Sequence, residues 1–151
     1  MHVVGIHTQC SAGRAVVRFV VLRHELAGWV EHDKFTHTCD QQEELPQQMM
    51  NLADALPHRL EGLDIRAAVL RDRDHSAGGV KIEHLKVDFT ADGVVLAAFR
   101  KRCIKTEEMH GNKIGALCGS DKATAEAAAA TEFGASYKQA GAAARAAATL
   151  A

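Results

Sequence analysis

The chain of 151 residues is 47% hydrophobic and 25% charged, which is enough for one globular domain whose core needs no disulfide or metal. The formal net charge of -1 and the isoelectric point near 6.7 exclude a bulk attraction to polyanions, so contact with nucleic acid requires a local basic patch. Because no run approaches the roughly 18 apolar residues of a membrane helix and the four cysteines form no C-x-x-C pair, we expect one domain over residues 1–151, reduced, cytoplasmic and without membrane contact.

Three strands are predicted in the first forty residues. An apolar run covers residues 2–8, Gly13 marks a turn, and residues 14–24 carry one uninterrupted apolar face. A second turn near Gly28 precedes a more polar strand over residues 29–38. This succession is typical of an antiparallel meander with one exposed strand.

The spacing of apolar residues then changes to three or four, which predicts helices. The first covers residues 45–60, with Pro46 in its first turn and Pro57 ending or kinking it. Residues 65–70 form a short apolar run typical of a buried central strand. A long helix follows over residues 80–102, and the basic cluster at its end complements the helix dipole.

The last part of the chain combines one strand with two helices. Residues 104–117 are predicted to form a strand followed by a loop, and Ser120 is the expected N-cap of a helix that ends near Ala130. After a break at residues 134–136, the final helix covers residues 139–150. The order of elements predicts an α/β fold, a mixed sheet flanked by helices.

This order is that of the RNase H-like superfamily, and three stretches resemble the RuvC-type Holliday-junction resolvases. VVGIHTQCSAGRAVVRFVVL resembles the opening strand, glycine turn and second strand of that family. LKVDFTADGVVLAAFRKRC resembles its second helix, with Gly93, Ala97 and Ala98 as small packing residues. KIGALCGSDKATAEAAAA, with Gly119, Ser120 and Lys122, resembles the segment that leads into a later helix. The resemblance implies an RNase H-like sheet over most of the chain.

The resemblance also implies where metals would bind. Such nucleases use two divalent ions held by carboxylates, which activate a water and stabilise the leaving oxygen of a phosphodiester. The matching positions here hold His7, Arg71, Ala140 and Ala143. We therefore predict a catalytically degenerate domain with no metal or cofactor. His7 and Arg71 are expected to lie side by side on adjacent central strands.

Two alternatives stay open beside this interpretation. An active nuclease could hold Mg²⁺ or Mn²⁺ at the same edge of the sheet with relocated ligands, namely Asp72, Asp74, Glu107 and Glu108. A purely structural assembly subunit would need no site at all. His7, His75 and His110 could meet at that edge, but no H-x-H or H-x-x-x-H spacing supports zinc. Cys103 is predicted to be a buried structural thiol.

Basic residues are the positive signal for binding. The residues predicted to contact nucleic acid or a partner protein are His7, Arg71, Arg100, Lys101, Arg102, Lys105, Lys113 and Lys122. The family resemblance further implies a homodimer formed through helices. The smooth alanine-rich stretches at residues 123–130 and 142–148 are compatible with such packing.

Overall fold

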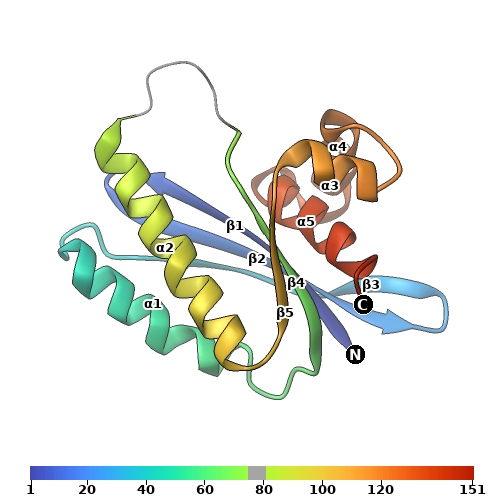
Figure 1. Ribbon diagram of the computed structural model, residues 1–151, viewed down its shortest axis with the longest axis horizontal. Helices are drawn as coiled ribbons and strands as arrows, with labels where there is room; N and C mark the ends of the chain where they lie inside the picture. The colour runs from blue at the N-terminus through green and yellow to red at the C-terminus, as the bar shows by residue number, and fades with distance from the viewer. Residues whose placement is uncertain (75–80) are drawn as a thin grey trace.

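The structure is a computed structural model that describes residues 1–74 and 81–151. Strands form one mixed sheet in the order β3-β2-β1-β4-β5 (Figure 1). Their bounds are β1 (His2–Ser11), β2 (Arg14–Glu25), β3 (Gly28–Thr38), β4 (Ile65–Arg71) and β5 (Lys105–Met109). The first three strands are antiparallel, whereas β4 pairs parallel with both β1 and β5. The predicted α/β fold with a mixed sheet is confirmed.

Helices cover both faces of this sheet. One face carries α1 (Leu45–Arg59) and α2 (Ile82–Lys101), and the other carries α3 (Gly111–Leu117), α4 (Lys122–Phe133) and α5 (Lys138–Ala148), with a short 3-10 turn at Ala135–Tyr137 (Figure 1). Two apolar clusters result because successive strand residues point to opposite faces. No helix in the described part of the chain is long and apolar enough to cross a membrane.

The segment after β5 differs from the prediction, because α3 occupies the predicted loop. Its glycines lower helix propensity, but one of them is required by packing. A Cβ at Gly115 would lie 2.5 Å from the backbone nitrogen of Lys122. The N-cap of α4 is Asp121 rather than the predicted Ser120, because its carboxylate accepts a hydrogen bond from the N–H of Thr124 at 2.7 Å.

Two smaller expectations also change. Cys103 is exposed and has a φ of 58°, so it is a turn residue and not the buried thiol that was predicted. The alanines of α5 pack against the sheet of their own chain, and Ala142 and Ala147 are each 0% exposed. The alanines of α5 are therefore enclosed within the fold and are not available to a second copy, whereas Ala123, Ala127 and Ala128 of α4 are exposed.

Candidate functional site

The candidate site lies where β4 ends and its parallel pairing with β1 stops. The register of these two strands pairs His7 directly with Arg71, as the sequence predicted. Both side chains point to the face that carries α5, because they alternate with Ile6 and Leu70 of the opposite cluster. The strand ends thus bring an imidazole and a guanidinium to one edge of the sheet.

Helix α5 packs directly against β1, and its backbone touches the backbone at Gly5. A Cβ at Gly5 would lie 2.0 Å from the carbonyl oxygen of Ala140 and 2.1 Å from the nitrogen of Ala144. Ala140 and Ala143 are 1% and 0% exposed. The two positions at which the family resemblance implied further ligands are therefore methyl groups inside a tightly packed helix–strand contact.

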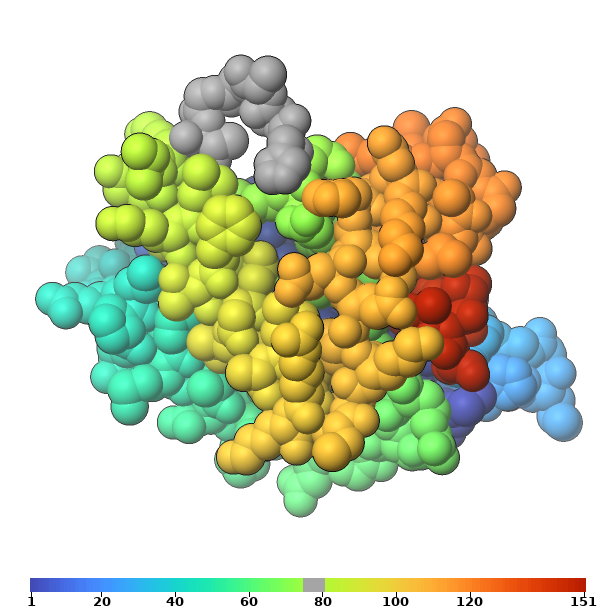
Figure 2. Space-filling model, viewed as in Figure 1, coloured from blue at the N-terminus to red at the C-terminus, as the bar shows by residue number. Residues whose placement is uncertain are grey.

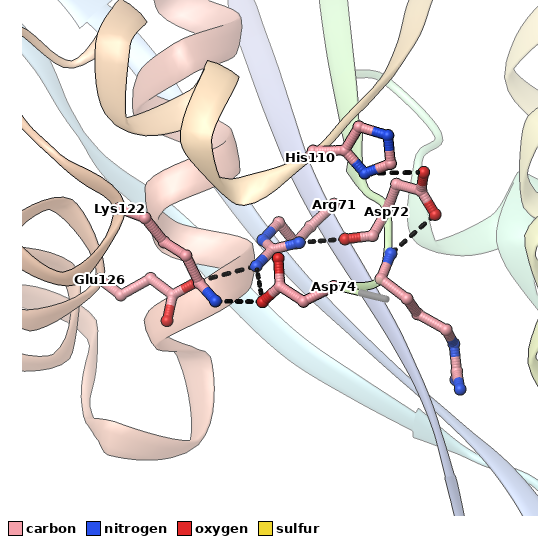
Figure 3. A network of polar contacts seen from close by, with 7 residues as sticks. Arg71, Asp72, Asp74, His110, Lys122 and Glu126 are labelled. Atoms are coloured by element: carbon pink, nitrogen blue, oxygen red, sulfur yellow. Dashed lines mark hydrogen bonds and ion pairs between the residues drawn. The ribbon is translucent and has the colours of Figure 1, made fainter. Parts of the chain in front are cut away.

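Arg71 is the centre of an ion-pair network (Figure 3). Its Nη2 lies 2.8 Å from Asp74 Oδ2 and 3.2 Å from Glu126 Oε1, and its Nη1 donates to the backbone carbonyl of Asp72. Lys122 forms a second ion pair with Asp74. The Arg71 side chain is only 2% exposed. Two cations and two carboxylates thus form a network with no net formal charge, and Arg71 is held as a fixed internal cation.

Local packing holds this network in place. A Cβ at Gly111 would lie 2.5 Å from Arg71 Nη2 and 2.7 Å from Lys122 Cδ, so the first residue of α3 has to be very small. Burial acts to raise the pKa of Asp74, but hydrogen bonds from Lys122 and Arg71 hold that pKa below its ordinary value. Asp74 is therefore ionised at neutral pH and fully engaged with its two cations.

His7 is neutral in this setting. Burial, followed by the charges of Arg18, Arg71 and Arg73, lowers the pKa of His7 to about 3. A neutral imidazole can donate one hydrogen bond and accept another, but it adds no positive charge. His7 consequently contributes no electrostatic attraction for an anion.

A second polar group lies on the opposite face of the same edge, towards α2. Arg73 is ion-paired with Asp88, which is 1% exposed. Burial raises the pKa of the neighbouring Asp92 to about 6, and the Thr8 hydroxyl and the Arg73 charge only partly oppose this. The sequence analysis did not single out this group, although two aspartates four residues apart lie on the same face of a predicted helix.

The alternative metal ligands pair with different residues. Asp72 Oδ2 lies 3.1 Å from His110 Nδ1, and Glu107 Oε2 lies 3.3 Å from Lys113 Nζ. Glu107 and Glu108 are consecutive strand residues, so their side chains point to opposite faces of the sheet. Within residues 1–74 and 81–151, no group of three or more His, Cys, Asp or Glu side chains is arranged to hold a metal ion. His75 lies outside the described residues.

The predicted basic residues fall into two sets. Lys122, on α4, belongs to the network, and Lys113 lies on α3, two residues after Gly111. The other set lies at the opposite edge, because Lys105 opens β5 beside Ala67 while Met109 closes it beside Arg71. This second set consists of Arg100, Lys101, Arg102 and Lys105 at the end of α2 and the start of β5. The eight residues singled out in the sequence therefore do not form one patch.

Comparison with solved structures identifies the architecture. The fold superimposes on that of Thermus thermophilus RuvC in complex with a Holliday junction substrate with a TM-score of 0.77 and 15% identity, covering 99% of this chain and 94% of that one. A second Thermus thermophilus RuvC structure gives a TM-score of 0.74 and 12% identity, again covering 99% of this chain and 94% of that one. The chain therefore has a RuvC-like, RNase H-like fold. No family model matches the sequence, and no curated protein matches it.

Proposed function

We propose that this RuvC-like domain is catalytically degenerate and binds nucleic acid without cleaving it. The observation that carries the proposal is the buried Arg71 guanidinium, fixed by Asp74 and Glu126 beside His7 at the ends of the central strands. Two-metal phosphodiester chemistry needs several hard oxygen ligands around its ions. A permanent internal cation at this position repels a divalent ion and is already paired with two carboxylates, those of Asp74 and Glu126.

The proposed interface is the edge around this network. Lys113 and Lys122 keep 57% and 33% of their side chains exposed, and both extend from the helices that border Arg71. These two lysines can contact phosphates. Arg71 is buried and does not reach the ligand, but it pairs with Asp74, and Asp74 pairs with Lys122. The similarity to a RuvC structure solved with a Holliday junction favours branched DNA as the ligand. With only a few phosphate contacts, binding should be weak and strongly salt-dependent.

The test is a binding and cleavage experiment on a labelled four-way DNA junction. Fluorescence anisotropy at low ionic strength should show binding that falls as salt is added, with no cleavage in Mg²⁺ or Mn²⁺. Lys122→Gln and Lys113→Gln should each weaken binding and reduce the dependence of log K on log salt by about one. Lys34→Gln is the matched control, because Lys34 is ion-paired to Glu31 on the distant edge strand.

Each alternative has its own outcome in this experiment. Cleavage that requires Mg²⁺ or Mn²⁺ and is abolished by Asp72→Asn would establish an active nuclease with relocated ligands. Absence of binding even at low ionic strength would leave a structural subunit, since phosphate contacts are strongest there.

We further infer that the protein forms a homodimer through α2. Ile82 and Phe89 are 69% and 55% exposed and lie seven residues apart, hence on one face of that helix. Figure 2 shows α2 uncovered at the molecular surface. Sedimentation should give a dimer that Phe89→Glu converts to a monomer, and a monomeric unmodified protein would contradict the inference.

A further inference from the structure

A groove runs between the C-terminal halves of α1 and α2, away from the strand ends. Leu56 and Leu60, each 1% exposed, form part of its floor, and small side chains such as Ala53 and Ala97 form its walls. Its volume is about 960 Å³. A concave, mainly apolar site with a few polar groups is the usual form of a binding site.

Pro57 leaves one carbonyl of α1 without its usual helical donor. The residue lies inside α1 and lines the groove together with Ala53. Proline has no N–H, so the carbonyl of Ala53, four residues earlier, lacks its helical donor. A peptide N–H would suit this carbonyl, whereas a hydrocarbon chain would not.

The end of the groove is positively charged. Arg102 Nη1 donates to the carbonyl of Leu60 at 2.9 Å, which fixes its guanidinium at the C-terminus of α1. Neither Arg102 nor Lys101 forms an ion pair with another of the described side chains. Asp54, which also lines the groove, lies six residues before Leu60 in α1, and six residues of helix correspond to about 9 Å along the axis. The groove therefore has one acidic and one basic end.

We propose that this groove binds an apolar peptide segment of a partner protein, with a carboxylate of that segment at the Lys101 and Arg102 end. The apolar floor receives the side chains, the Ala53 carbonyl accepts a peptide N–H, and the two cations pair with the acid. This surface is separate from the network around Arg71, so the inference does not depend on nucleic-acid binding.

Selection from a phage library of random linear peptides, followed by anisotropy with the enriched peptides in free labelled form, tests the proposal. Enriched sequences should combine apolar residues with Asp or Glu. Ala97→Trp, which fills the groove, and Lys101→Gln, which removes a charge, should each weaken peptide binding by about tenfold, as expected for an anchor contact. Arg100→Gln is the matched control, because Arg100 belongs to the same basic cluster but does not line the groove.

Several outcomes would contradict the proposal. Peptides that bind Ala97→Trp and Lys101→Gln as well as the unmodified protein, with both variants folded by circular dichroism, would overturn the proposal. So would enrichment of purely apolar peptides, or no enrichment at all. If Ala97→Trp converts a dimer to a monomer in sedimentation, the occupant is a second copy of this chain and the proposal is wrong. Junction binding by Lys101→Gln should equal that of the unmodified protein, which separates this site from the interface near Lys122.

Discussion

At the residue scale, Arg71 should be a large single contributor to stability. Replacing it with Gln leaves Asp74 and the largely buried Glu126 without their shared cation. Loss of one partner of a buried ion pair costs about 3 kcal/mol, so urea unfolding of Arg71→Gln should show a decrease of that order. Arg66→Gln removes an exposed pair with Asp64 and should cost less than about 1 kcal/mol. Equal effects of the two changes would show that the network around Arg71 adds nothing to the free energy of unfolding.

The buried carboxyl of Asp92 should affect the dependence of stability on pH. Its folded pKa of about 6 lies above the ordinary value of 3.8, so between these values the folded state binds more protons than the unfolded state. Stability linked to Asp92 is therefore present at low pH and is lost as pH rises towards 6. Relative to the unmodified protein, Asp92→Asn should gain about 2 kcal/mol between pH 4 and pH 7 in urea titrations. The same pH dependence in Asp92→Asn and in the unmodified protein would contradict this expectation.

His7 acts in the opposite direction over an overlapping range. Because its pKa falls from 6.5 to about 3 on folding, the unfolded state binds the extra proton between these values. Stability linked to His7 is complete above pH 6.5 and decreases as pH falls towards 3. His7→Asn should therefore lose less stability than the unmodified protein when the pH is lowered from 7 to 4. An unchanged pH profile would show that His7 is solvated and not buried.

At the scale of elements, the contact of β1 with α5 depends on one glycine. Gly5→Ala places a Cβ 2.0 Å from the carbonyl oxygen of Ala140, so α5 has to shift, at a cost of about 3 kcal/mol in thermal or urea unfolding. Gly93→Ala, in α2, meets nothing within 4 Å and should stabilise by about 1 kcal/mol through helix propensity. If both changes had the same sign, the close approach of α5 would be refuted.

The elements that could be predicted were those with a clear apolar period. The strands and the long helices follow from alternation or from spacings of three and four residues, and the pairing of His7 with Arg71 follows from the order of elements. Helix α3 could not be found this way, because its glycines are set by tertiary contacts, with Arg71 forty residues earlier and with the start of α4, and not by an apolar period. Of the two acidic partners of Arg71, Asp74 lies three residues away in a segment of alternating charges, whereas Glu126 was missed because it lies 55 residues away.

At the scale of the whole molecule, net charge should control the proposed binding of DNA. The chain contains nine histidines and carries a formal net charge of -1 when all of them are neutral. Histidine is the residue type whose charge commonly changes between pH 8 and pH 6, and a gain of two positive charges would make the net charge positive. Junction affinity at constant ionic strength should therefore rise between pH 8 and pH 6. A flat profile would mean that local contacts alone determine affinity.

The close fit of α5 against Gly5 limits which side chains this edge of the sheet can accept. Ala140 and Ala143 lie in a contact with no spare volume, and Arg71 is tied to two acids. Introducing a carboxylate at position 7 or 71 alone would remove stability without forming a metal site, and an acid at position 140 would need α5 to move first. Variants that carry only one of these acids should therefore be less stable than the unmodified protein. The packing around Gly5 and the pairing of Arg71 thus make an acidic site at this edge inaccessible by single substitutions.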